Sequence, residues 1–135
     1  MDDYEMNQKK NVERNKKFLE EFKEYLIVNK LSDKTIRNHL SNVELYINDY
    51  LNYYGVSKME DGCHEIGMFL GDWFIRKCMW STATSIKSTA SSIKKFYKCM
   101  NELNYVSKED YKYLCDTIKN RMNDWIDEVN EYNNF

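Results

Sequence analysis

The sequence predicts a single all-α domain, and three features of its 135 residues support that fold class. Proline, the strongest helix breaker, is absent, and glycine occurs only four times. Apolar residues recur at alternating steps of three and four along five successive segments, which is the spacing of one helix face. A chain of this length with 42% hydrophobic residues can bury a core without metal or disulfide staples.

The first two predicted helices span about residues 11–28 and 33–54. Phe18, Phe22 and Leu26 lie on one face of the first helix. Ser32 or Asp33 is a suitable N-cap for the second helix. The apolar positions of the second helix are Ile36, Leu40, Val43, Ile47, Leu51 and Tyr54. Gly55 predicts its end, because glycine readily adopts the left-handed conformation that closes a helix.

Three further helices complete the prediction. Residues 61–79 form a third helix that is apolar around most of its circumference, so we expect it to be the most buried. The fourth begins near Ser81 and ends at Asn104 and Tyr105. The fifth follows Ser107, which forms a capping-box pattern with Asp110. Its apolar ladder consists of Tyr111, Cys115, Ile118, Met122, Trp125, Val129 and Tyr132.

The chain offers few residues for catalysis or metal binding. Its four cysteines are widely spaced, and the adjacent Cys63 and His64 are poorly placed to bind one zinc ion together. We expect structural thiols in a reducing cytoplasm. His39 is expected to be structural rather than a base or a ligand. The pair His64 and Glu65 lacks the second histidine of a zinc-protease motif. We therefore expect a protein that is no enzyme and has no cofactor and no metal.

Two features predict a cytoplasmic location. No stretch approaches the roughly 20 uncharged apolar residues that a membrane-spanning helix needs. The first residues are acidic and lack the apolar core of a signal peptide.

The net charge of −2 conceals an uneven distribution. Residues 73–100 include six basic residues and no acidic one. One line along the predicted fourth helix consists of Thr84, Lys87, Ser91, Lys94 and Lys98, with Lys95 beside it. The second helix opens with a similar surface: Lys34, Thr35, Arg37, Asn38 and Ser41. Lysines with interspersed hydroxyls suit a phosphate backbone. The alternative is a solvated face, but such faces usually mix both signs.

Two motifs resemble the N-terminal core-binding domain of tyrosine recombinases and phage integrases. The segment Ser32–Ile36 is similar to the Ser-x-x-Thr start of that family's second helix. The segment Ser91–Tyr97 matches the pattern of its fourth helix: Ser, two small or apolar residues, a basic residue and x-Phe-Tyr. The resemblance covers about residues 15–106.

This resemblance implies a four-helix, SAM-like core-binding bundle that clamps one face of duplex DNA, here with an additional C-terminal amphipathic helix. In that family the second and fourth helices approach the major groove. Carried over by position, the DNA-binding residues are Lys34, Thr35, Arg37, Thr84, Lys87, Ser91, Lys94 and Lys95. Lys98 joins them through the charge pattern.

The departures from the family concern base reading and catalysis. His39 stands where the family usually has tyrosine, and Lys94 stands where it often has arginine. Lysine cannot make the planar, bidentate contact that arginine makes with guanine. We therefore expect binding to the DNA backbone more than sequence-specific recognition of bases. The chain also lacks the His-x-x-Arg box of the catalytic domain. The resemblance therefore implies a non-catalytic DNA-binding domain, either free-standing or cut from a longer recombinase.

The predicted fifth helix leaves two roles open. Residues 1–106 form the core-binding-like domain with an N-terminal extension, and residues 107–135 form the additional helix. Its apolar ladder would either pack back on the bundle or form a seam with a second copy or a recombinase partner. In the second case the chain would be a helical protein-interaction module with Trp125, Met122 and Val129 at the interface.

Overall fold

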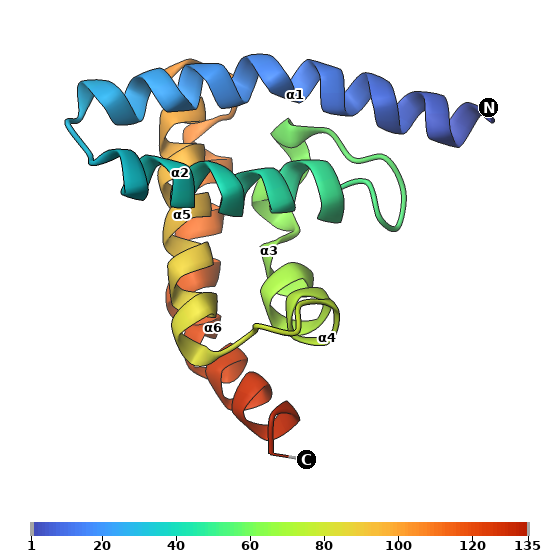
Figure 1. The fold of residues 1–135 in the computed structure, drawn as a ribbon, viewed down its shortest axis with the longest axis vertical. Helices are drawn as coiled ribbons and strands as arrows, with labels where there is room; N and C mark the ends of the chain where they lie inside the picture. Colours follow the sequence, from blue (N-terminus) through green and yellow to red (C-terminus); the bar gives the residue numbers. More distant parts are fainter. Residues whose placement is uncertain (1, 135) are drawn as a thin grey trace.

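The computed structural model describes residues 2–134, all of whose regular structure is helical. Met1 and Phe135, the outer ends of the predicted segments 1–106 and 107–135, lie outside the described residues. In Figure 1, α1 and α2 lie side by side across one end of the long helices α5 and α6, while α3 and α4 fill the space beside them. No helix among residues 2–134 combines the length and the apolar character needed to cross a membrane.

Helix α1 spans Asp3–Val28 and begins eight residues earlier than the apolar pattern predicts. The Asp2 side chain caps it by accepting a hydrogen bond from the Glu5 backbone N–H. Its first turns are held by polar contacts, which a hydrophobic pattern does not register. Tyr4 donates a hydrogen bond to the Asn52 carbonyl at 2.6 Å, and Asn11 donates one to the Asn52 side chain at 2.9 Å.

Helix α2 spans Asp33–Glu44, and Ser32 caps it as predicted. The chain then continues through a π-helical turn, η1, at Leu45–Tyr50. The helical backbone thus ends earlier than residue 54, and the prediction that Gly55 is a left-handed terminator is wrong, since no described glycine has a positive φ. The left-handed positions belong to Lys30, after α1, and Asn104, after α5.

The predicted third helix is divided into four short pieces. They are the 3₁₀ turn η2 at Met59–His64, α3 at Ile66–Met68, the π-helical turn η3 at Phe69–Trp73 and α4 at Phe74–Lys77. Most apolar side chains of the predicted helix are buried, but Met68 is 56% exposed and Met79 is fully exposed. The buried apolar side chains of this region are Met59, Cys63, Ile66, Phe69, Leu70, Trp73, Phe74 and Ile75.

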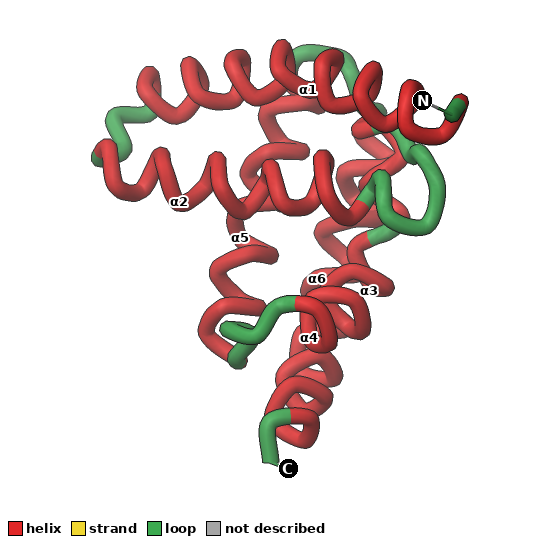
Figure 2. Tube along the Cα trace, turned by 45° about the vertical axis from the view of Figure 1, so that its right-hand side comes forward, coloured by secondary structure: helices red, strands yellow, loops and turns green. Residues whose placement is uncertain are grey.

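Helices α5 and α6 span Ala83–Glu102 and Lys108–Tyr132 and pack against each other along the chain's long axis (Figure 2). The Ser107 side chain caps α6 by accepting from the Asp110 backbone N–H at 3.1 Å. Helix α6 packs on its own bundle, with Trp125 only 1% exposed and Val129 fully buried. Both residues given as possible interface anchors thus lie in the chain's own core, and Met122 is also partly buried against it.

Candidate nucleic-acid interface

The exposed side of α5 has the composition expected from the sequence. All five residues of the predicted line are exposed: Thr84, Lys87, Ser91, Lys94 and Lys98. Lys95, beside this line, is half-buried. The neighbouring line of Ile86, Ala90, Ile93 and Tyr97 is buried in the core. Because one side of the helix is fixed in the core, its lysines have a fixed direction toward solvent.

Helix α2 contributes two more exposed cations, Lys34 and Arg37. Thr35, predicted to contact DNA, has a different local role. Its hydroxyl accepts a hydrogen bond from the Ser32 hydroxyl at 2.9 Å, and its backbone N–H donates to the same hydroxyl at 3.2 Å. Thr35 is therefore part of the helix cap, while the neighbouring cations remain at the surface.

A buried serine joins α2 to α5. The Ser92 hydroxyl accepts a hydrogen bond from the Asn42 side chain at 3.0 Å and lies 2.7 Å from His39 Nδ1. It also donates to the Ser88 carbonyl one turn earlier in α5. These bonds fix the two helices relative to each other, so their exposed surfaces keep one arrangement. The sequence marks Ser92 only as a small residue within a motif, and its partners depend on the tertiary fold.

His39 at this crossing remains neutral near physiological pH. Burial lowers the pKa of its imidazole, because a charged ring would lose hydration, and the nearby positive charge of Lys95 lowers it further. Lys95 of α5 therefore lies near His39 of α2. The structural role expected for His39 agrees with this geometry.

The cations on this side have no internal partners. Six cations on α2 and α5 form no salt bridge among residues 2–134. They are Lys34, Arg37, Lys87, Lys94, Lys95 and Lys98. We call these six residues, with Thr84 and Ser91, the basic face. The other two cations of the acid-free stretch are engaged, because Arg76 pairs with Asp72 and Lys77 lies over the ring of Tyr53.

One aromatic residue borders the basic face from another helix. Tyr111 of α6 lines a shallow hollow of about 380 Å³ together with Ser91, Lys94, Lys95 and Lys98. Burial raises the pKa of the Tyr111 phenol, so its hydroxyl stays protonated and is able to donate a hydrogen bond. The sequence places Tyr111 only in the apolar ladder of its helix, because periodicity does not show which residues of another helix lie nearby.

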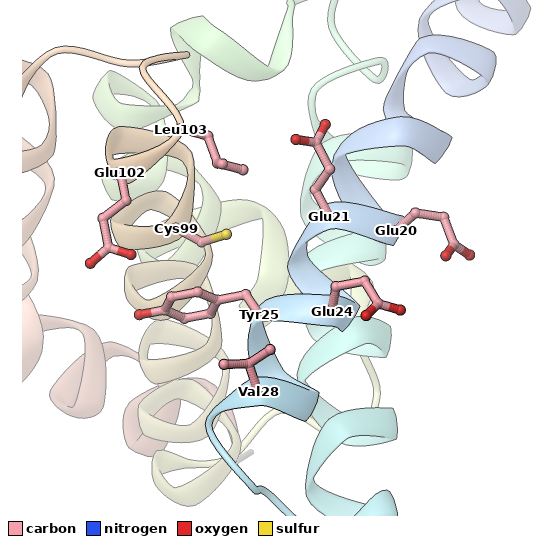
Figure 3. Close-up of a pocket in the computed structure, with 8 residues that line it drawn as sticks. All are labelled: Glu20, Glu21, Glu24, Tyr25, Val28, Cys99, Glu102 and Leu103. Carbon is pink, nitrogen blue, oxygen red and sulfur yellow. The ribbon is translucent and has the colours of Figure 1, made fainter.

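A second hollow, between α1 and α5, has the opposite charge. Its apolar floor consists of Tyr25, Val28, Cys99 and Leu103 (Figure 3). Four carboxylates surround that floor: Glu20, Glu21, Glu24 and Glu102. We call this the acidic groove, and its volume is about 450 Å³. Carboxylates repel phosphates, so this groove bounds the anion-binding surface toward the C-terminal end of α5, where Glu102 follows Lys98 by one helical turn.

The cysteines and carboxylates form no metal centre among residues 2–134. Burial raises the pKa of Cys63 to about 12 and that of Cys78 to about 11, so both thiols are protonated. Cys99 is buried as well, and Cys115 is partly exposed. The cysteines are all free thiols.

Comparison of the chain with protein-family models, with curated proteins and with solved structures gives no match. The function must therefore be inferred from the chain's own residues, and the basic face is its most distinctive surface.

Proposed function

We propose that this chain is a non-catalytic DNA-binding domain of the tyrosine recombinase core-binding type, which holds duplex DNA by its phosphates. The observation that supports the proposal most strongly is the basic face. Six cations that form no salt bridge among residues 2–134 occupy two helices that Ser92 joins. Such a surface releases condensed counterions when it contacts a duplex, and that release drives binding.

The side chains on this face favour the DNA backbone over base edges. Five of the six cations are lysines, which act as point charges on flexible stems. Thr84 and Ser91 are exposed and short, so they let α5 approach closely and can donate to phosphate oxygens. Arg37 is the only arginine of the basic face, and it alone could make a bidentate contact with guanine. We therefore propose binding with weak sequence preference.

The same proposal includes a correspondence between the helices of this chain and those of the core-binding family. The four helices of a SAM-like core-binding bundle would correspond to α1, α2, the irregular segment 59–77 and α5. Helix α6 would be the additional element. The serine cap of α2 and the Ser91–Tyr97 motif on α5 support this correspondence. The alternative, a protein-interaction module that uses α6, has less support because Trp125 and Val129 are buried within the chain.

The test compares two triple variants that remove the same charge. We expect Lys87→Ala, Lys94→Ala and Lys98→Ala together to weaken binding to a fluorescent duplex of about 20 base pairs by roughly tenfold or more at low salt. The control replaces Lys9, Lys10 and Lys23, which are exposed on α1, by alanine. Fluorescence anisotropy measures both affinities. Absence of duplex binding by the wild type, or equal losses in the two variants, would contradict the proposal.

A further inference from the structure

Two apolar side chains project from the loop that joins α4 to α5. Met79 is 100% exposed and Trp80 is 62% exposed. The loop around them is well anchored, because Cys78 and Ser81 are buried on either side. Asn133 also donates a hydrogen bond to the Ser81 carbonyl at 2.9 Å. We call Met79 and Trp80 the apolar tip. Its exposure is a fixed feature of the fold, and exposed apolar groups of this kind often mark binding sites.

Trp80 also lines a hollow that separates the tip from α2 and η1. Its volume is about 540 Å³. The hollow combines an indole, two apolar side chains, a hydroxyl, two amides and two carboxylates. These are Trp80, Val12, Leu45, Ser41, Asn42, Asn48, Glu44 and Asp49. We call it the Trp80 hollow. An aromatic plane beside hydrogen-bonding groups is the combination that recognises a flat, polar heterocycle.

The carboxylates indicate which part of a nucleic acid the hollow suits. Neither Glu44 nor Asp49 forms a salt bridge within residues 2–134. Two negative charges would repel a phosphate, but they accept hydrogen bonds from the exocyclic amino groups of bases. Cytosine, adenine and guanine each present such an amino group on their pairing edge, while thymine presents two carbonyl oxygens and a single ring N–H there. The chemistry therefore favours an amino-bearing base over the DNA backbone.

The hollow adjoins the surface proposed to hold DNA. Ser41 belongs to the exposed polar side of α2, one turn beyond Arg37. Trp80 precedes the Thr82 cap of α5, and Thr84 of the basic face lies in the first turn of that helix. An unpaired end of a DNA strand can therefore reach the Trp80 hollow when the neighbouring duplex lies on the basic face.

We propose that the Trp80 hollow accepts one unpaired base that bears an amino group (cytosine, adenine or guanine), stacked on the Trp80 indole, from DNA whose duplex part lies on the basic face. This inference rests on the proposed DNA-binding function. It adds a preference for DNA with an unpaired base beside a duplex. Stacking on Trp80 supplies affinity, and the carboxylates of Glu44 and Asp49 select the amino-bearing edge.

The fluorescence of the protein reports on this site directly. Trp73 and Trp125 are buried, so Trp80 is the tryptophan that acrylamide in solution can reach most easily. Three probes are compared: a blunt duplex, the same duplex with a short deoxycytidine overhang, and the same duplex with a thymidine overhang. We expect the cytidine overhang to shield Trp80 from acrylamide and to bind about fivefold or more tightly than the blunt duplex.

Two variants separate stacking from edge recognition. Trp80→Ala should abolish the advantage of the cytidine overhang and leave affinity for the blunt duplex within about twofold, because stacking is lost and phosphate contacts are kept. Asp49→Asn should reduce the preference for cytidine over thymidine. Tyr113→Ala removes another exposed aromatic residue, on α6, and should change neither quantity.

Two results would overturn this inference while leaving the proposed function intact. One is tight binding of the blunt duplex with no gain from the cytidine overhang. The other is Trp80 fluorescence that acrylamide quenches as readily in the complex with the cytidine-overhang DNA as in the free protein. Failure of the wild type to bind the blunt duplex at low salt would count against the proposed function itself.

Discussion

Two buried tyrosine hydroxyls fix the irregular segment that follows η1. Tyr97 donates a hydrogen bond to the Met59 carbonyl at 2.7 Å, and Tyr46 donates one to the Gly62 carbonyl. Both rings are fully buried, and burial raises the pKa of both phenols well above the ordinary value. Each hydroxyl therefore stays a neutral donor. Gly62 makes this arrangement possible, because a Cβ at that position would overlap the Tyr97 hydroxyl.

Gly62→Ala tests this close contact. We expect the substitution to lower the free energy of unfolding by about 3 kcal/mol, because the buried Tyr97 has no room to move away. Urea unfolding followed by circular dichroism measures the loss. Gly55→Ala is the matched control, since no heavy atom lies within 4 Å of the Cβ it would add. If both variants were equally stable, the packing described for Gly62 would be incorrect.

At the scale of elements, the burial of Trp125 and Val129 favours packing of the last helix on its own bundle, one of the two roles left open for it. The 3–4 spacing predicts most of the packed face of α6, although Tyr132 is exposed and the buried Leu114 is outside the predicted ladder. A helical period does not identify what covers that face. The covering elements are α5 and the irregular segment 59–77, and Gly71 allows their close approach. A Cβ at Gly71 would lie 3.0 Å from the Trp125 ring.

Trp125→Ala distinguishes a core residue from an interface residue. We expect a loss of about 3–5 kcal/mol of unfolding free energy, because truncating a buried tryptophan leaves a cavity. Thermal unfolding measures the stability, and sedimentation measures the mass. Asp127→Ala, at an exposed position of the same helix, should have almost no effect. A variant with wild-type stability that lost a dimer seen in the wild type would instead make Trp125 an interface residue.

The crossing of α2 and α5 should make stability depend on pH. The pKa of His39 is lowered by burial, so the folded state favours the neutral ring. The stability from this site is therefore fully present above the unfolded pKa of about 6.5 and is lost as the pH falls below it. Between about pH 7.5 and about pH 5.5, the wild type should lose more unfolding free energy than His39→Gln. Urea midpoints at both pH values measure this difference, and identical changes would contradict the role given to His39.

The irregular segment 59–77 shows where sequence patterns are insufficient for elements. Its apolar residues predict most of the burial correctly, but they predict one helix where the structure has two short α-helices, a 3₁₀ turn and a π-helical turn. The breaks depend on Tyr97 and Tyr46, which contact this segment from distant positions in the chain. The N-terminal turns of α1 are similar, because they are held by hydrogen bonds to Asn52 and not by apolar packing.

At the scale of the whole molecule, the near-neutral net charge is the sum of a basic face and an acidic groove that meet near the C-terminal end of α5. The basic face lies on α2 and α5, and the acidic groove lies between α1 and α5. Charges separated by more than about 10 Å are largely screened at 0.1 M salt, so a bound anion responds mainly to the nearest face. A net charge of −2 is therefore compatible with binding to DNA.

The position of the basic face could be predicted from charge and helical period, because α5 is regular and capped at the expected place. Which cations are free could not be predicted, since Arg76 and Lys77 look equivalent to the others in sequence and are engaged by Asp72 and Tyr53. The Ser92 contacts and the Trp80 hollow also require the tertiary fold, because they join residues far apart in the chain.

The dependence of duplex affinity on salt concentration tests the central claim most directly. About four to six phosphate contacts predict a log–log slope of roughly −4 to −5 for the wild type. Replacing Lys87, Lys94 and Lys98 by alanine should make the slope shallower by about 2 to 3, because each lost phosphate contact removes about 0.9. A slope near zero for the wild type, or an unchanged slope for the triple variant, would contradict phosphate binding by the basic face.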